Sequence, residues 1–359
     1  MTTTREGTQL VAPDKYAIET VRSAGQALLV AELSANHDKD LDYALSLVDV
    51  AADCGWHCLK LQTYTAESLT MRSSHRSMTV DPVWGHTNLY DLYAEASMPM
   101  EFHEPLFERA RARGLVPFTS VYDPRDLDFV EELGCELYKV ASFELTYDDL
   151  LIELAHAGKP IVLSTGMASM GEVAHAIETI NRHGSPEITL LHCCSSYPAP
   201  LDQINLKAMG KLRDRFGVPA GFSDHTEGAV GALTAIAMGA TMIEKHFTSD
   251  QSRPGPDHRF SATPETLRLI SSGADNVYRM WGDGNKTTAA SEQVSKEIGR
   301  RSAFALRDLE PGTTLTRDDF RFIRPAAGIP PTDRRALEEA TLSRFVAQGT
   351  PITYEDLGQ

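Results

Sequence analysis

The sequence predicts an α/β protein built on a (β/α)8 TIM barrel, followed by a small β-rich C-terminal domain. Eight short, β-rich apolar segments occur between residues 27 and 246, and a segment with helical spacing separates each from the next. Strands that alternate with helices form a parallel sheet, and eight such units in a row favour closure into a barrel. A doubly wound open sheet is the structural alternative.

The expected elements follow one another in a regular order. The strands span Ala27–Glu32, His57–Gln62, Leu115–Ser120, Glu136–Ala141, Pro160–Ser164, Glu187–Cys193, Pro219–Phe222 and Ala240–His246. Most of the helices carry apolar residues at helical spacing. They span Leu41–Cys54, Glu101–Arg113, Arg125–Leu133, Tyr147–Ala157, Met170–His183, Gln203–Phe216, Gly228–Met238 and Thr263–Trp281.

One connection is longer than a barrel requires. Thr63–Met100 contains Trp84, Tyr90 and Tyr93 and a short helical pattern over Leu89–Ala96. Long loops in compact domains are commonly functional. We therefore predict that this connection crosses the barrel mouth as a substrate lid.

The chain divides into four segments by composition. Residues 1–26 form an N-terminal extension, 27–282 the barrel, 283–300 a polar linker, and 301–359 a small domain rich in Pro and Gly. Short strands are expected in the last segment at Ser302–Leu306 and Phe320–Ile323. This segment is too small for a second catalytic domain.

The composition is that of a soluble protein from a reducing compartment. The five cysteines form no CxxC pair, the N-terminus lacks the apolar core of a signal peptide, and no apolar run approaches membrane-spanning length. We therefore expect a cytoplasmic location. The net charge of -16 argues against nucleic acid and membrane partners, although a locally basic site still allows an anionic substrate.

Two histidines end the last two expected strands. Ser223–Thr226 closes one strand and Glu244–Phe247 closes the next. Successive strand ends lie side by side on the ligand-binding face of a barrel, so His225 and His246 can share one metal ion or substrate. Alternation along the strand turns Lys245 away from the face of His246. Two unrelated histidines at strand ends are the alternative.

Two expected strands contain a lysine, Lys60 and Lys139. A buried ammonium group must find an anion, because burying it unpaired is costly. The neighbouring strand ends carry the hydroxyls of Ser120, Ser142 and Ser164. Together these groups form a phosphate or carboxylate pocket. Lysines that pair with Glu32 or another acid for structural reasons are the alternative.

Two imidazoles with oxygen ligands nearby suit a divalent transition ion such as Mn²⁺ or Zn²⁺, with positions open for substrate or water. Such an ion polarises a carbonyl or activates water. Beside an anion pocket, this favours condensation of a phosphorylated three-carbon unit with an aldehyde, although a metal-dependent aldolase or hydrolase also fits. Asp257, in the turn-rich loop after the last strand, is either a ligand for metal or sugar hydroxyls or a plain loop carboxylate.

A series of motifs runs along the chain in the order of the expected strands. They are Ala31-Glu32 with Asn36-His37, Lys60 followed by Gln62-Thr63, Ser164–Met167, Tyr197–Pro200, Ser223–Thr226, Glu244–Phe247 and Pro254–His258. Together they resemble the sialic acid synthase family over nearly the whole chain from about residue 27. The resemblance implies a phosphoenolpyruvate-dependent nonulosonic acid synthase with a C-terminal antifreeze-like (SAF) domain, assembled as a domain-swapped homodimer.

The same resemblance implies roles for individual residues. His225 and His246 would bind the metal ion, with Mn²⁺ as the first choice and Mg²⁺ or Co²⁺ as alternatives. The residues around phosphoenolpyruvate would be Lys60, Ser120, Lys139, Ser142 and Ser164. Those around the amino sugar would be Gln62, Tyr197, Asp257 and Arg324, the last contributed by the other subunit. Glu32 would complete the catalytic set by handling protons at the sugar or water.

Several motifs depart from the N-acetylneuraminate synthase pattern. Leu33–Ala35, Ala141–Glu144, Ser195-Ser196, Leu61–Tyr64 and Leu89–Tyr93 are more similar to the pseudaminic acid synthase branch, whereas Pro254–His258 is not. The favoured substrate is therefore a 6-deoxy diacetamido hexose. N-acetylneuraminate or legionaminate synthesis and an unusual sugar of specialised metabolism are alternatives. A metal-dependent pyruvate aldolase and a non-catalytic sugar-binding relative are further alternatives.

Overall fold

The computed structural model describes Val21, residues 24–80 and residues 88–358. The chain divides into two compact units, Met1–Gly282 and Asp283–Gln359, and each is described by itself. Most of the predicted N-terminal extension lies outside the described residues.

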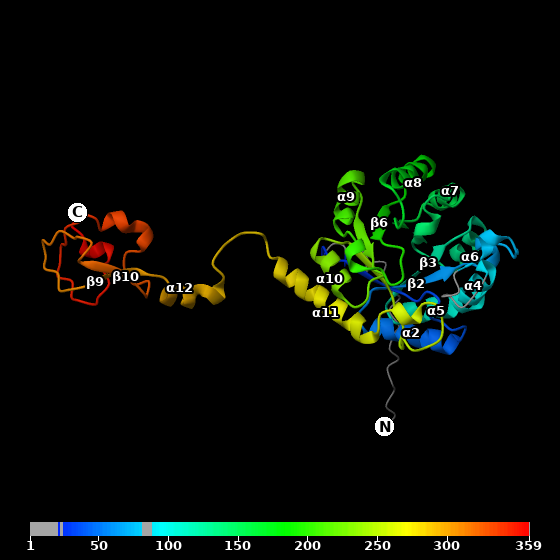
Figure 1. The fold of residues 1–359 in the computed structure, drawn as a ribbon, viewed down its shortest axis with the longest axis horizontal. Helices are drawn as coiled ribbons and strands as arrows, with labels where there is room; N and C mark the ends of the chain where they lie inside the picture. Colours follow the sequence, from blue (N-terminus) through cyan, green and yellow to red (C-terminus); the bar gives the residue numbers. More distant parts are fainter. Residues whose placement is uncertain (1–20, 22–23, 81–87, 359) are drawn as a thin grey trace, which may run out of the picture. The chain divides into compact units, whose positions relative to one another are not determined.

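Eight parallel strands close into a barrel in chain order (Figure 1). They are β1 (Leu28–Glu32), β2 (Cys58–Thr63), β3 (Val116–Val121), β4 (Tyr138–Val140), β5 (Ile161–Ser164), β6 (Ile188–Cys193), β7 (Ala220–Ser223) and β8 (Met242–His246). The last strand pairs with the first, from Met242 opposite Leu28 to His246 opposite Glu32, and this pairing closes the sheet. The predicted barrel is confirmed, and the alternative of an open sheet is wrong.

Helices follow the strands and cover the outside of the barrel (Figure 1). They are α2 (Leu41–Asp53), α5 (His103–Ala112), α6 (Leu127–Glu132), α7 (Asp148–Ala157), α8 (Met170–His183), α9 (Lys207–Phe216), α10 (Val230–Ala237) and α11 (Pro264–Trp281). Among the described residues, no helix combines the length and apolar character needed to cross a membrane.

Local sequence signals set the ends of these helices. Asp40 caps the N-terminus of α2 with its side chain, and Ser169 forms a capping box with Glu172 at the start of α8. Gly158 and Gly217 end α7 and α9 in the left-handed conformation that glycine adopts most easily. Helix α9 begins later than predicted, because Asn205 has a φ of 48° and interrupts the helical pattern.

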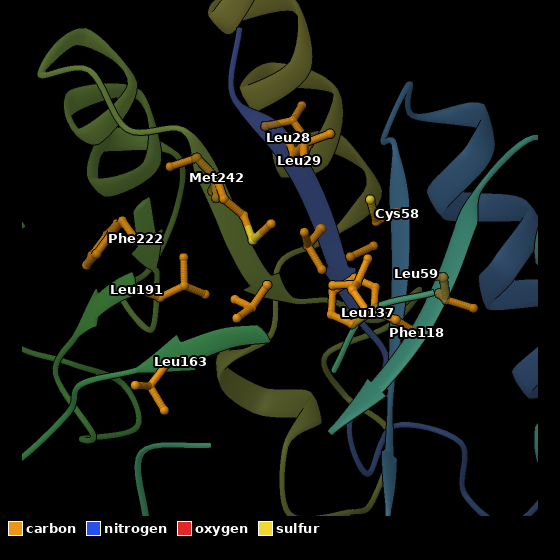
Figure 2. Close-up of a cluster of buried hydrophobic side chains, with 14 of the residues drawn as sticks. Leu28, Leu29, Cys58, Leu59, Phe118, Leu137, Leu163, Leu191, Phe222 and Met242 are labelled. Atoms are coloured by element: carbon orange, nitrogen blue, oxygen red, sulfur yellow. The ribbon is translucent and has the colours of Figure 1, made fainter. Parts of the chain in front are cut away.

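The core of this unit lies inside the barrel and between the barrel and its helices. Figure 2 shows Leu28, Phe118, Leu191 and Phe222 packed among other apolar side chains of the strands. All six residues of β3 are buried, as expected for a parallel strand covered on both faces. Continuous burial of this kind produces the uninterrupted apolar runs from which the strands were predicted.

The long connection between β2 and α5 contains two helices, α3 (Ala66–Leu69) and α4 (Leu89–Ala96). Helix α4 has the bounds predicted from the sequence. Residues 81–87 of this connection, including Trp84, lie outside the described residues.

The second unit contains a short antiparallel pair, β9 (Ser302–Ala305) and β10 (Phe320–Ile323). It has its own apolar core, made by Ala303, Ala305, Leu309, Leu315, Phe320, Ile329, Leu337, Leu342, Val346 and Ile352. Helix α12 (Gln293–Gly299) lies in the segment predicted as a linker. Arg324 follows β10 directly and is exposed.

Candidate active site

A cavity of about 560 Å³ opens at the C-terminal ends of the strands. The predicted site residues that line it are Lys60, Gln62, Lys139, Ser142, Ser164, Tyr197, His225, His246 and Asp257. Glu32 and Ser120 are fully buried and lie behind Lys60, which contacts both of them. Arg324 belongs to the second unit. The barrel therefore gathers nine of the twelve predicted residues around one cavity.

The structure brings His225 and His246 together, with ring centroids 5.5 Å apart. His225 Nδ1 lies 2.8 Å from the carbonyl oxygen of Cys194. A carbonyl only accepts hydrogen bonds, so Nδ1 carries the proton and Nε2 keeps its lone pair. Burial lowers the pKa of His225 to about 3, which keeps the ring neutral. Its Nε2 atom therefore has a lone pair that can bind a cation.

His246 is the second candidate ligand. Its Nδ1 atom is buried without a hydrogen-bond partner and lies 3.7 Å from Asp257 Oδ2. Asp257 also accepts hydrogen bonds from the Ser34 hydroxyl and the Ala35 amide. Burial opposes ionisation of Asp257, but the contacts with His246 and Ser34 outweigh it and lower its pKa. A carboxylate thus lies beside the histidine pair.

This donor set fits a divalent ion that keeps open positions. In the described part of the chain, no group of three or more His, Cys, Asp and Glu side chains is arranged to hold a metal. The protein would thus supply the two imidazoles and leave the remaining positions to water and substrate. The unpartnered Nδ1 atom of His246 supports this interpretation, because buried polar atoms normally have partners.

Lys60 and Lys139 share one acid at the floor of the cavity. Their Nζ atoms lie 3.7 Å and 3.8 Å from Oε1 of Glu244, and Lys60 also forms an ion pair with Glu32. Burial lowers the pKa of Lys139. For Lys60, burial is outweighed by Glu244 and Glu32, which raise its pKa. The lysines are paired with acids, and both also line the cavity, so anion binding by them stays a prediction.

Glu32 is not among the residues that line the cavity. It is fully buried, accepts a hydrogen bond of 2.9 Å from Gln62 Nε2, and pairs with Lys60. Burial raises the pKa of its carboxyl group. Glu32 therefore contacts the cavity through Gln62 and Lys60, and its role in proton transfer stays a prediction.

Three serines that line the cavity, Ser142, Ser164 and Ser195, form what we call the hydroxyl cradle. The hydroxyls of Ser142 and Ser195 lie beside Gly166. The Gly166 amide donates to Ser142 Oγ at 3.0 Å. The hydroxyls of Ser164 and Ser195 are buried without hydrogen-bond partners. A Cβ atom at Gly166 would approach Ser195 Oγ to 2.2 Å and Ser142 Oγ to 2.8 Å. The cradle thus offers unpaired donors in a space that only glycine leaves open.

Two family models match this chain. The NeuB family model matches residues 47–286, and the SAF domain model matches residues 300–358. The chain belongs to the NeuB family. The predicted sialic acid synthase family is therefore confirmed, together with the C-terminal SAF domain.

Several relatives of this chain are named as synthases of pseudaminic acid, diacetyllegionaminic acid or N-acetylneuraminate 9-phosphate. A pseudaminic acid synthase of Helicobacter pylori is 35% identical and covers 92% of this chain and 97% of its own. An N,N'-diacetyllegionaminic acid synthase of Campylobacter jejuni is 34% identical, and the match covers 85% of this chain and 92% of the relative. Among solved structures, an N-acetylneuraminic acid synthetase of Leptospira borgpetersenii is 31% identical, with a TM-score of 0.67. The match covers 75% of this chain and 90% of the solved one.

The Tyr197 ring packs against both histidines, His225 and His246. Its ring centroid lies 4.2 Å from that of His225, 5.7 Å from that of His246 and 5.3 Å from that of Phe260. The phenol ring thus shields both imidazoles on one side. Lys245, on the opposite face of β8, is buried outside the cavity, as the alternation of the strand predicts.

Several further cavity residues were assigned no role from the sequence, among them Glu144 and Ser195. Burial raises the pKa of Glu144 to about 7, and its Oε2 atom has no hydrogen-bond partner. Glu144 follows β4 in a short turn, and Ser195 follows β6. Their place after strand ends was the available signal, but a strand end alone does not show which side chains turn inward.

Proposed function

We propose that the protein condenses phosphoenolpyruvate with the open-chain aldehyde of an N-acylated amino-hexose to give a nine-carbon nonulosonic acid and phosphate. The single observation that carries this proposal is one cavity that contains both the histidine pair and the hydroxyl cradle with its two lysines. A site for an anion and a site for a carbonyl-polarising cation would thus lie within reach of one pair of substrates. The relatives support the same class of product.

The anionic end of phosphoenolpyruvate would bind at the lysines and the hydroxyl cradle. Ammonium groups and unpaired hydroxyls are suitable donors for phosphate and carboxylate oxygens. Lys60 and Lys139 would contact these oxygens, and Ser120 would hold the Lys60 ammonium, to which it is bonded at 3.0 Å. Binding would position the methylene carbon of phosphoenolpyruvate toward the histidine pair.

The reaction forms one carbon–carbon bond and one carbon–oxygen bond to water, and it breaks the carbon–oxygen bond to phosphate. The methylene carbon attacks the aldehyde carbon, and the aldehyde oxygen takes up a proton. Water then adds to the resulting oxocarbenium carbon and loses a proton. Phosphate leaves with its bridging oxygen as the hydroxyl from water loses its remaining proton and becomes the keto group. We propose Glu32 for proton transfer to the sugar or water, because its carboxyl group bonds to Lys60 and Gln62, both of which line the cavity.

His225 and His246 would hold a divalent ion, with Mn²⁺ as the first choice and Mg²⁺ or Co²⁺ as alternatives. When bound, such an ion supplies Lewis-acid polarisation of the aldehyde oxygen. Tyr197 would keep bulk water away from the imidazoles that it covers, and Asp257 would accept a hydrogen bond from a sugar hydroxyl beside His246. Gln62 would present its amide to the sugar from the same cavity wall.

The 6-deoxy diacetamido hexose of pseudaminic acid synthesis is the favoured sugar. The Helicobacter pylori pseudaminic acid synthase supports it with 35% identity over 97% of its length. The diacetyllegionaminic acid synthase, at 34% identity, makes a related sugar the second candidate.

We also propose that the active form is a domain-swapped homodimer. The match to the SAF domain supports this arrangement, in which Arg324 would cross to the other subunit and contact the acylamino group of the sugar. The net charge of -16 is consistent with small-molecule substrates and with the absence of nucleic acid and membrane partners.

The test is an assay of purified full-length protein with phosphoenolpyruvate, MnCl2 and a panel of N-acylated amino-hexoses. We expect phosphate release with at least one sugar, and mass spectrometry should find the nine-carbon product. EDTA should abolish the activity and added Mn²⁺ should restore it. Phosphate release should be lost in His225→Ala and retained in the matched control His175→Ala, whose imidazole bonds to Asp148 on the outer helices.

Three outcomes would count against the proposal. Consumption of free pyruvate without phosphate release would indicate an aldolase. A full panel without any product would indicate a non-catalytic relative. Activity that survives complete metal removal would exclude the role of the ion.

A further inference from the structure

The cavity has two chemically different sides. The strand ends contribute the polar side, with the histidine pair, the lysines and the hydroxyl cradle. The connection between β2 and α5 contributes what we call the apolar wall, which consists of Tyr64, Leu69, Leu89, Leu92, Tyr93 and Ala96. A ligand that fills the cavity must therefore carry polar groups at one end and apolar groups at the other.

Helix α4 turns its apolar face toward this cavity. Leu89, Leu92, Tyr93 and Ala96 have the spacing i, i+3, i+4, i+7, which places them on one side of a helix. All four line the cavity, and no residue of α4 is buried in the protein core. An apolar helix face that lines a cavity rather than a core is available to contact a ligand.

The other side of α4 is held by polar contacts. Tyr90 donates a hydrogen bond to Glu67, and Asp91 lies 2.9 Å from Arg72. The Arg72 guanidinium also lies over the Tyr90 ring, 4.2 Å from its centroid. These contacts favour the rotation of the helix that directs its apolar face at the cavity.

The C-terminal turn of α4 is attached to the loop after β1. Lys39 Nζ donates to the Ala94 carbonyl at 2.7 Å, and His37 Nε2 donates to the Ala96 carbonyl at 3.2 Å. The same loop carries Ser34, whose hydroxyl donates to Asp257. The apolar wall is thus positioned relative to the carboxylate beside the histidine pair.

Aromatic contacts extend the wall toward the cavity floor. The Tyr64 ring lies between Tyr93 and Tyr122, with centroid distances of 6.3 Å and 5.1 Å. Burial raises the pKa of Tyr64 above its ordinary range, so the phenol stays neutral. The wall therefore presents aliphatic carbon and aromatic rings without a charge of its own.

We propose that the apolar wall selects the sugar, and that Leu89 and Leu92 contact the methyl groups of a 6-deoxy hexose with two acetamido groups. This inference rests on the proposed function, because it assigns one end of the same site. A 6-deoxy diacetamido sugar has three methyl groups. N-acetylmannosamine has one, and it would place a hydroxymethyl group against leucine, where burial without a hydrogen-bond partner is unfavourable.

The size of the expected selectivity follows from the chemistry. One methylene in an apolar pocket changes kcat/KM by about 10–200-fold, and an apolar pocket rejects an added hydroxyl by about 100-fold. We therefore expect kcat/KM for the 6-deoxy diacetamido sugar to exceed that for N-acetylmannosamine by about 100-fold in the wild-type protein.

The experiment compares these two sugars at saturating phosphoenolpyruvate in wild-type protein, Leu92→Asn and Leu89→Asn. Each variant should lower kcat/KM for the 6-deoxy diacetamido sugar by about 10-fold or more and change that for N-acetylmannosamine by less than about 3-fold. Leu269→Asn is the matched control, because Leu269 is exposed on α11 and should leave both values unchanged. Unchanged KM for phosphoenolpyruvate would show that each variant is folded.

The outcomes separate this inference from the proposed function. A protein that uses both sugars equally, or variants that lower both values by the same factor, would overturn the selection by the apolar wall and leave the synthase assignment intact. A protein that releases no phosphate with either sugar or with the wider panel would overturn the proposed function, and this inference with it.

Discussion

Lys245 and Asp224 form a buried ion pair behind the histidine pair, with Lys245 Nζ 2.8 Å from Asp224 Oδ2. Lys245 also donates to the Thr226 carbonyl at 2.6 Å, and Asp224 Oδ1 accepts from the Thr226 amide and hydroxyl. These bonds enclose the short turn that contains His225. The pair therefore connects the backbone positions of the two candidate metal ligands, one after β7 and one at the end of β8.

Replacement of Lys245 by methionine should destabilise the protein by about 3–5 kcal/mol, because it leaves the Asp224 carboxylate buried without its partner. Urea unfolding measures this change. Lys211→Met, at an exposed position of α9, is the control and should be nearly neutral. The double variant Lys245→Met with Asp224→Asn should recover part of the loss. A Lys245→Met protein as stable as the wild type would contradict the bracing role of the pair.

Substitution of Gly166 by alanine should raise KM for phosphoenolpyruvate by about 10-fold or more, since the new methyl group displaces the hydroxyls of the cradle. The contacted atoms are side-chain tips, including Ser195 Oγ at 2.2 Å, so the stability cost should be small. Steady-state kinetics and thermal unfolding together distinguish the two effects. Gly171→Ala is the matched control, because its nearest neighbour is Ser169 Oγ at 3.8 Å. Equal KM values in both variants would exclude the cradle from anion binding.

Glu144 should make stability depend on pH between about 4.5 and 7. Burial raises its pKa from 4.5 to about 7 in the folded protein. Over this interval the unfolded chain loses the proton while the folded protein keeps it, so stability falls as pH rises through it, by about 1–3 kcal/mol. The glutamine side chain of Glu144→Gln is neutral at every pH, so this variant should not show the fall in stability.

Urea unfolding at several pH values measures the effect of Glu144. The difference in unfolding free energy between Glu144→Gln and the wild type should grow in favour of the variant up to about pH 7 and then stay constant. Glu178→Gln, at an exposed position of α8, should show no such trend. A pH-independent difference for Glu144→Gln would mean that this carboxyl group ionises normally in the folded state.

Arg324→Ala should raise KM for the sugar by about 10-fold or more and leave KM for phosphoenolpyruvate unchanged, because the proposed contact is with the acylamino group alone. Both constants are measured in the full-length protein. Arg321→Ala, at an exposed position of β10, is the matched control. Sugar kinetics identical to those of the wild type would remove Arg324 from the site.

The barrel could be predicted because its physical causes are local. Strands covered on both faces produce continuous apolar runs, as in Leu28, Leu29, Val30 and Ala31 of β1, and the alternating helices leave few other arrangements. The side of a strand residue also follows from its position, which is why the outward direction of Lys245 agrees with the structure. The meeting of His225 and His246 follows from strand order in the same way.

The depth at which a strand side chain lies within the barrel could not be predicted, because it depends on the closure of all eight strands. Glu32 and Ser120 face the barrel interior, yet they lie behind Lys60. The raised pKa of Glu144 depends on neighbours from other elements, which its own turn does not reveal. The apolar face of α4 was visible as a helical pattern, but its contact with the cavity depends on the bonds from His37 and Lys39.

The attachment of α4 through His37 and Lys39 has a consequence for how such enzymes diversify. The groups proposed for the chemistry project from the strand ends, whereas the apolar wall is carried by a single inserted connection that is held by its main-chain carbonyls. Because backbone atoms form this attachment, and Tyr90 and Asp91 on the other side of α4 keep their own contacts, the cavity-lining side chains of α4 can change without releasing the helix. If the apolar wall selects the sugar as proposed, a lineage could acquire a new sugar by exchanging a few residues of one short helix, while the groups at the strand ends stay the same.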